Sequence, residues 1–250
     1  MKPYIAAEDA GVLRLHGLDA FDPLWALQLP EVDKPNTAGR GWSSVVRLEL
    51  GERTYYLKRQ SNYLQRSLIR PFGEPTVACE FRNIQRYARK GVAALDAAFF
   101  ATQDVAGEKR AILLTRALDG WMDLDALLRD WSTLGPAQQR AILLACGDLA
   151  GQLHRAGETH GCFYPKHIFL RQEGDAYAAR LIDLEKTRVL LRRQDRVRDL
   201  EALVRRVGFW SETDLRELLG AYLQAERSAP TVDTWLTRIG VRRQRKEARP

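Results

Sequence analysis

HGCFYPKHIFL at residues 160–170 and RLIDLE at residues 180–185 are the two stretches that decide the fold. The first is a loop with two histidines, His160 and His167, that enters a strand expected over 168–171. The second is a short apolar strand, expected over 180–182, that ends at Asp183. A carboxylate in that position is costly unless it is paired or bound to a metal ion. The stretches therefore indicate a polar site at the end of a strand pair. Partly buried histidines in a packed loop and a turn-capping aspartate are the alternatives.

Upstream, the sequence predicts a β-hairpin. Residues 44–50 (SVVRLEL) alternate apolar and polar side chains, as a half-buried strand does. Gly51-Glu52 supplies a turn, and residues 54–58 (TYYLK) are rich in β-formers. The second strand of this hairpin ends at Lys58.

The remaining elements separate into a strand-rich half and a helical half. A helix with Val77, Phe81 and Ile84 on one face is expected over 74–90, followed by strands over 98–102 and 111–115. Helices are expected over 124–131, 136–156, 195–207 and 212–225. Strands followed by helices indicate an α+β fold with two lobes. We place an N-lobe at 1–115 and a C-lobe at 116–250.

Two features of the strand-rich half could bind phosphate. Gly39 and Gly41, in AGRGWSS before the hairpin, allow a tight turn with N–H groups free for a ligand, although most such turns are only turns. The absence of GKS or GKT excludes a P-loop. Lys58 can reach nucleotide phosphates from a strand, and Glu80, mid-helix among apolar neighbours, is the best anion to hold it. An ordinary surface lysine is the alternative.

The order of these parts is that of protein-kinase-like folds: glycine turn, strand lysine, helix glutamate, histidine loop, then an aspartate after an apolar strand. In detail the chain resembles the lipopolysaccharide kinase family, the Kdo and heptose kinases with their InaA-like relatives. The resemblance rests on GRGWSS, YYLKRQ, CEFRNIQRYARKGV, LHRAG, HGCFYPKHIFL, LIDLEKTR and RVRDL, between residues 38 and 200. The longest stretches are closest to the InaA-like branch.

The resemblance implies a role for each matched residue. Gly39 and Gly41 would cover the ATP phosphates, and Lys58 would hold them with Glu80 as its partner. Residues 115–118, from Thr115 to Leu118, would join the lobes and face adenine. In the helical half, His160 would open the catalytic loop, Asp183 would be the main Mg²⁺ ligand and His167 a second one. Asp199 would brace the loop.

The sequence departs from this pattern at the expected catalytic base. Counting from His160, the position of the catalytic aspartate is occupied by Cys162. A neutral thiol cannot accept and orient a hydroxyl proton as a carboxylate does. General-base help is worth about 10²–10⁴-fold, whereas positioning and charge stabilisation carry most of phosphoryl transfer. Two hypotheses follow: a phosphotransferase acting on heptose or Kdo of the lipopolysaccharide core, or a pseudokinase that binds nucleotide or glycolipid and regulates a partner.

Charge and composition limit the partners and the location. The net charge of +7 lies entirely in residues 186–250, which contain 16 Lys and Arg against 9 Asp and Glu. Such a surface suits an anionic glycolipid membrane, and a solvated helical surface with a loose basic tail at 241–250 is the alternative. Nucleic-acid binding has only this charge in its favour and no motif, so we do not expect it. Three cysteines without zinc spacing, and acidic residues near the start, predict a cytoplasmic protein. The family resemblance implies that it acts peripherally at the inner membrane. The oligomeric state is not predicted.

Overall fold

The structure is a computed structural model that describes residues 3–32, 34–38, 41–65, 71 and 73–248. The chain divides into two compact units. The first consists of Met1–Arg86 with Leu95–Asp119, and the second of Tyr87–Ala94 with Gly120–Pro250. Each unit has its own core and is described separately.

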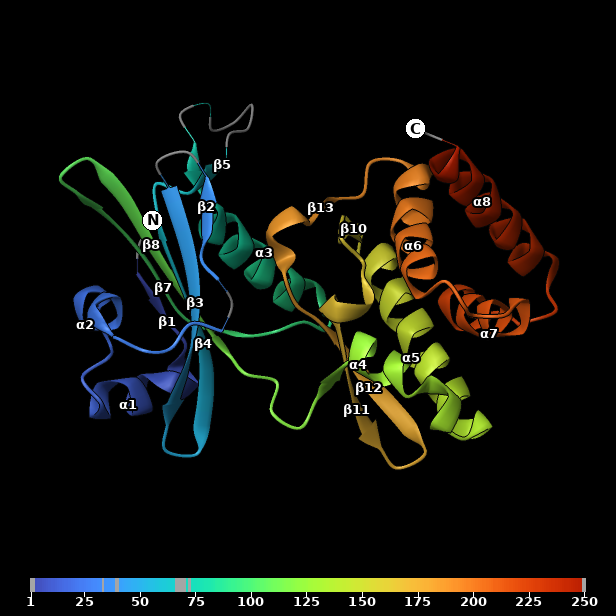
Figure 1. Ribbon diagram of the computed structural model, residues 1–250, viewed down its shortest axis with the longest axis horizontal. Coiled ribbons are helices and arrows are strands. Elements are labelled where there is room, and N and C mark those ends of the chain that lie inside the picture. The colour runs from blue at the N-terminus through green and yellow to red at the C-terminus, as the bar shows by residue number, and fades with distance from the viewer. Residues whose placement is uncertain (1–2, 33, 39–40, 66–70, 72, 249–250) are drawn as a thin grey trace. The chain divides into compact units, whose positions relative to one another are not determined.

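The first unit is built on a six-stranded antiparallel sheet with the strand order β1-β7-β8-β4-β3-β2 (Figure 1). In chain order the strands are β1 (Tyr4–Ile5), β2 (Asn36–Ala38), β3 (Gly41–Leu50), β4 (Arg53–Ser61), β7 (Ala97–Val105) and β8 (Glu108–Arg116). The short strands β5 (Leu64–Gln65) and β6 (Glu74–Pro75) pair with each other. The predicted hairpin is confirmed as β3 and β4.

Strand register determines which face of the sheet each β4 side chain occupies. Leu57 is opposite Leu114 of β8, and both belong to the core on one face. The next residue, Lys58, is opposite Leu113, which is in turn opposite Phe100 of β7. Because side chains alternate along a strand, Lys58 shares the other face with these two apolar residues.

Helices cover both faces of this sheet (Figure 1). Helices α1 (Ala7–Leu15) and α2 (Phe21–Ala26) cover one face through Leu13 and Leu24, which are fully buried. Helix α3 (Thr76–Lys90) covers the other, where Phe81 stacks on Phe100 with ring centroids 4.3 Å apart. The helix predicted from residue 74 thus begins two residues later, after β6.

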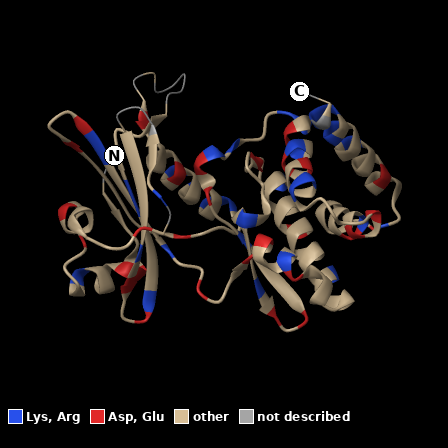
Figure 2. Ribbon diagram, in the orientation of Figure 1, with Lys and Arg blue, Asp and Glu red and all other residues tan. Residues whose placement is uncertain are grey.

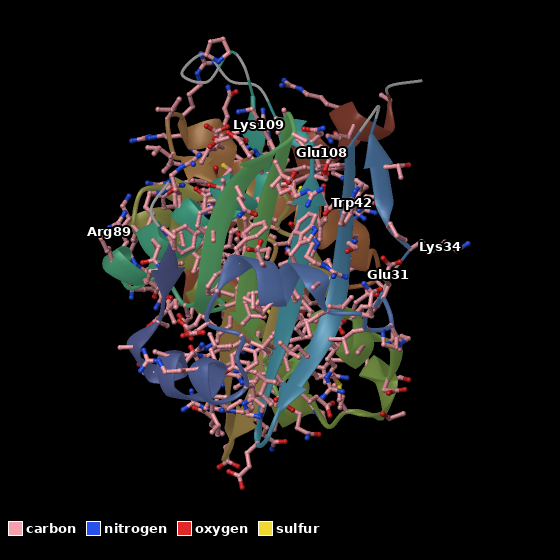
Figure 3. The ribbon with its side chains drawn as sticks, turned by 90° about the vertical axis from the view of Figure 1, so that its left-hand side faces the viewer. Glu31, Lys34, Trp42, Arg89, Glu108 and Lys109 are labelled. Carbon is pink, nitrogen blue, oxygen red and sulfur yellow. The ribbon has the colours of Figure 1, made fainter. Side chains whose placement is uncertain are left out.

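Polar and aromatic contacts tie α1 and α2 to the sheet. Asp9 of α1 is buried, and its carboxylate accepts hydrogen bonds from Tyr55 (2.8 Å) and Arg116 (2.8 Å). Trp25 of α2 packs on Trp42 of β3 with ring centroids 5.5 Å apart. Figure 3 labels Trp42 on this strand. Neither helix was expected from the sequence.

The second unit is mainly helical. Its helices, besides the last turn of α3, are α4 (Leu124–Arg129), α5 (Pro136–Arg155), α6 (Arg193–Val207), α7 (Glu212–Leu223) and α8 (Pro230–Glu247). Helices α5 and α7 approach closely because Gly147 has no side chain. A Cβ there would lie 2.2 Å from the carbonyl oxygen of Leu218 in α7.

Short strands and turns position the loops of this unit. A three-stranded sheet has the order β12-β11-β9, with β9 (Met122–Asp123), β11 (Ile168–Glu173) and β12 (Ala176–Leu181). β10 (Glu158–Thr159) pairs with β13 (Arg188–Val189), and the 3₁₀ turns are Trp131–Thr133, Pro165–His167 and Leu184–Lys186. The predicted strands at 168–171 and 180–182 correspond to β11 and β12.

The alternative of a loose basic tail is wrong for residues 241–247. They form the last turns of α8, whose inner face buries Val232 and Ile239, seven residues apart. Seven residues make nearly two helical turns, so this spacing keeps the apolar side chains on one face. Within the described residues, no helix has the length and apolar character needed to cross a bilayer.

Candidate functional site

In the first unit, Lys58 and Glu80 form an ion pair. The Lys58 Nζ lies 2.8 Å from both Oε1 and Oε2 of Glu80. Glu80 is buried, whereas one quarter of the Lys58 side chain is exposed. A buried carboxylate is costly without a partner, so this pair satisfies Glu80 and holds the ammonium group at the edge of the α3 face. The sequence predicted this pairing from residue type and order alone.

The glycine turn is described only in part. Gly39 lies outside the described residues. Gly41 is the first residue of β3, and its partner Ala38 is the last residue of β2, so 39–40 connect the two strands. A Cβ on Gly41 would lie 2.3 Å from the carbonyl oxygen of Asn62. The backbone packing of the first unit therefore requires glycine here, whatever the turn binds.

The segment expected to face adenine lies at the end of β8. Thr115 is buried, and its hydroxyl lies 3.5 Å from the Tyr56 carbonyl oxygen. Leu118 follows the strand and is half-buried.

In the second unit, the carboxylate of Asp199 holds the start of the histidine loop. Asp199 lies on α6 and is buried. Its Oδ2 accepts the backbone N–H of His160 at 2.8 Å, and its Oδ1 accepts that of Gly161 at 3.0 Å. Hydrogen bonds to a charged acceptor are worth about 1.5–3 kcal/mol each. This geometry is what the expected bracing role requires.

His160 is fixed inside the loop by two hydrogen bonds. The backbone N–H of Cys162 donates to Nδ1 (3.3 Å), so neutral His160 carries its proton on Nε2 and donates to the Ile182 carbonyl oxygen (2.9 Å). Burial lowers the pKa of His160, although the charge of Asp199 opposes the shift. His160 therefore links the loop to the strand end before Asp183. Cys162 is itself buried.

His167 and Asp183 face each other. His167 donates from Nδ1 to the Cys162 carbonyl oxygen at 2.9 Å, which leaves its Nε2 3.2 Å from Oδ2 of Asp183. Burial lowers the pKa of His167, and the charge of Asp183 opposes that shift. Two lone pairs at this distance repel, so neutral His167 beside the carboxylate is favourable only with a cation between or next to them.

The backbone of this site is strained at Asp183 and tightly packed at Gly161. Asp183 has φ 57° and ψ 61°, in the left-handed region that non-glycine residues rarely adopt. Gly161 has φ 77°, and a Cβ there would lie 2.8 Å from the carbonyl oxygen of Lys186. The histidine loop and the turn after Asp183 therefore pack backbone to backbone.

His154 is a residue of this network that the sequence did not predict as functional. Its Nε2 lies 3.3 Å from Oδ2 of Asp199, and its Nδ1 lies 3.1 Å from the Tyr222 hydroxyl. These partners are 45 and 68 residues away along the chain. His154 lies in the LHRAG stretch, which is part of the family resemblance, but the resemblance assigned it no role.

Comparison with known structures identifies the fold. A structure described as WaaP in complex with acyl carrier protein matches 98% of this chain and 99% of its own with a TM-score of 0.71 and 23% identity. The fold is therefore the kinase-like α+β fold of WaaP, as the sequence predicted.

Sequence comparison identifies the family. Residues 22–222 match the lipopolysaccharide kinase (Kdo/WaaP) family. Protein InaA of Escherichia coli K12 is 33% identical over 181 residues, which cover 70% of this chain and 82% of InaA. The lipopolysaccharide core heptose(I) kinase WaaP of Pseudomonas aeruginosa is 28% identical over 133 residues, half of each chain. The chain belongs to the Kdo/WaaP lipopolysaccharide kinase family.

Proposed function

We propose that this protein is an ATP-dependent phosphotransferase that acts on a heptose or Kdo hydroxyl of the lipopolysaccharide core. The observation that carries the proposal is the ion pair between Lys58 and buried Glu80 in a member of this kinase family. A partly exposed lysine ammonium group held by a buried carboxylate is arranged to meet phosphate oxygens. Thr115 and Leu118 would contact the adenine, with Gly39 and Gly41 beside the phosphates.

The residues of the second unit fit a divalent cation. Asp183 supplies the oxygen ligand that Mg²⁺ prefers, and Mg²⁺ usually takes its other ligands from water and phosphate. His167 offers an imidazole nitrogen as a further ligand, whereas oxygen ligands suit both Mg²⁺ and Mn²⁺. The cation would balance the charge of the nucleotide phosphates. Asp199 and His160 would hold the loop in place for both ligands.

Nucleotide titrations with and without Mg²⁺ or Mn²⁺ test the binding half of this proposal. We expect Lys58→Ala and Asp183→Asn each to weaken ATP binding at least tenfold, since hydrogen bonds to charged groups are worth about 1.5–3 kcal/mol. Asparagine tolerates the left-handed backbone of Asp183, so that variant removes charge without adding strain. Arg47→Ala, an exposed change on β3, is the matched control. Equal affinity in all four proteins would show that the phosphate site is elsewhere.

Cys162 motivates a second candidate function. It stands where the resemblance places the catalytic carboxylate, and the chain would then be a pseudokinase that binds nucleotide or glycolipid and regulates a partner. ATP consumption with and without purified lipopolysaccharide core acceptors separates the two. We expect turnover only with an acceptor. If the natural protein is inert and Cys162→Asp creates turnover, the pseudokinase is the correct assignment.

The site of action would be the cytoplasmic face of the inner membrane. The excess positive charge of residues 186–250 would attract anionic lipid headgroups and phosphorylated core sugars. Flotation with anionic and neutral vesicles tests this: binding that does not weaken with salt would contradict an electrostatic contact.

A further inference from the structure

Two adjoining hollows lie among α5, α6, α7 and α8, and none of the residues 160–167 lines them. Their volumes are about 340 and 540 Å³, and both are lined by Arg193 and Arg238. We call them together the α6–α8 basin. Figure 2 shows Lys and Arg along α6 and at the C-terminal end of α8. Volumes of this size are typical of small-ligand sites.

The described lining of the basin is basic and contains no carboxylate. The smaller hollow has four arginines in its wall, and the larger adds further basic side chains from α8. The four are Arg155, Arg193, Arg196 and Arg238. Like charges held together repel, so this arrangement costs free energy unless an anion enters.

Three of the four arginines of the smaller hollow have no carboxylate partner in the described part of the chain, although Arg196 also interacts with the Tyr222 hydroxyl. Among the described residues, no carboxylate oxygen lies within 4.0 Å of a side-chain nitrogen of Arg193, Arg196 or Arg238. The Nε of Arg196 is buried and has no hydrogen-bond partner there. An orphaned buried donor is costly, and guanidinium groups match phosphate oxygens in geometry.

Aromatic rings form part of the same wall. Trp235 of α8 meets Tyr222 of α7 edge to face, with centroids 5.0 Å apart, and Arg238 lies over the Trp235 ring at 5.7 Å. Rings beside arginines suit a ligand that combines an anionic group with a sugar or another apolar face.

The basin and the histidine loop share a hydrogen-bond chain. Tyr222 and His154 line the smaller hollow, and the Tyr222 hydroxyl lies 3.1 Å from Nδ1 of His154. His154 in turn contacts Asp199, which holds the N–H groups of His160 and Gly161. A ligand that orders Tyr222 would therefore order the loop.

We propose that the α6–α8 basin is a second ligand site, which binds a phosphate-bearing group and steadies the loop 160–167 through Tyr222, His154 and Asp199. The phosphate belongs either to a soluble sugar phosphate or to a lipid headgroup. This proposal goes beyond the proposed function and does not depend on ATP binding or phosphate transfer.

Binding measurements with two probes test the site. Inorganic pyrophosphate is titrated by calorimetry, and vesicles of phosphatidylcholine and phosphatidylglycerol are used in flotation. The basin variant combines Arg193→Ala with Arg238→Ala, and the control combines Arg47→Ala with Arg129→Ala, two exposed arginines outside the basin. Neither variant changes Lys58 or its surroundings, so a difference in probe binding between the two variants is due to the basin.

We expect the basin variant to bind at least one probe at least tenfold more weakly than the control does. Loss for pyrophosphate alone identifies a soluble phosphate ester, and loss for vesicles alone a lipid headgroup. Equal binding of both probes by both variants would overturn the proposal.

Hydrogen exchange tests the connection to the loop. Pyrophosphate, or the vesicles if only they bind, should slow amide exchange in 154–167 of the natural protein. Tyr222→Phe keeps the ring but removes the hydroxyl, so it should retain binding and lose that protection. Unchanged exchange on binding, or full protection in Tyr222→Phe, would refute the connection.

Discussion

The carboxylate of Asp199 should contribute strongly to the stability of the second unit. It is buried and accepts two backbone N–H groups, at 2.8 and 3.0 Å, besides its contact with His154. Asp199→Ala removes these acceptors and leaves the N–H groups of His160 and Gly161 unpaired. Two hydrogen bonds to a charged group total about 3–6 kcal/mol, and water entering the space recovers part of it. We expect a loss of about 3–5 kcal/mol in the free energy of unfolding.

Urea unfolding of the full chain, followed by tryptophan fluorescence and by circular dichroism, measures this loss. Two probes are needed because two units can unfold in separate transitions. Asp195→Ala is the matched control: Asp195 lies in the first turn of the same helix, pairs with Arg188 and Arg198, and accepts the Arg192 backbone N–H at 3.2 Å. Removing this helix cap should cost about 1 kcal/mol. If Asp199→Ala costs no more than this control, the carboxylate does not hold the loop.

Three further predictions concern packing, a thiol and pH. Gly147→Ala should destabilise the protein by about 1–3 kcal/mol, because its Cβ would lie 2.2 Å from the α7 backbone. Gly11→Ala, in an α1 position with no atom near the added Cβ, should stabilise the protein by about 0.5–1 kcal/mol. Urea unfolding compares the two variants, and a change of the same sign in the free energy of unfolding of both would contradict the packing argument. Burial raises the pKa of Cys146 to about 12, so mass spectrometry should find this thiol unlabelled by iodoacetamide in native protein at pH 8 and labelled after unfolding; rapid native labelling would contradict its burial. Burial lowers the pKa of His160 and of His167 below 6.5, so the unfolded chain binds protons at a higher pH than the folded protein does. The free energy of unfolding should therefore stay constant above pH 6.5 and decrease as the pH falls below it. A constant free energy of unfolding between pH 7 and 5 would contradict the shifts.

Alternation and residue type sufficed to predict the centre of the first unit. The pattern of residues 44–58 fixed the hairpin, and strand alternation then puts Lys58 on the face that α3 covers. Glu80 could be predicted as its partner because a carboxylate among apolar helix neighbours needs a cation. The sequence was informative here because the two partners lie only 22 residues apart along the chain.

The terminal helices could not be predicted from the same signals. α1 buries only Asp9 and Leu13, and α2 has six residues, so neither has an apolar face long enough to stand out. In α8 the many charged residues of the last turns made the segment look polar, so the apolar face that includes Val232 and Ile239 was not recognised. Tertiary packing stabilises these helices more than their own sequence does.

The loop network was predictable only in part. Residue order suggested His160, His167 and Asp183, and the family resemblance added Asp199. Neither indicated how hydrogen bonds assign the imidazole protons. Those assignments follow from backbone groups that only the folded loop brings near, such as the carbonyl oxygens of Cys162 and Ile182. His154 joins the network through tertiary contacts alone.

The costs of the site favour ligand binding over a purely structural role. A left-handed Asp183 costs of the order of 1–3 kcal/mol, and its carboxylate faces a histidine nitrogen whose lone pair repels it. Buried ion pairs such as Lys58 with Glu80 are also weak contributors to stability, because desolvation offsets their attraction. A protein that bound no ligand would be more stable with apolar or unstrained residues at these positions. A bound phosphate and cation would instead make Lys58 and Asp183 favourable. Both units therefore contain groups whose energetic cost a bound phosphate and cation would offset.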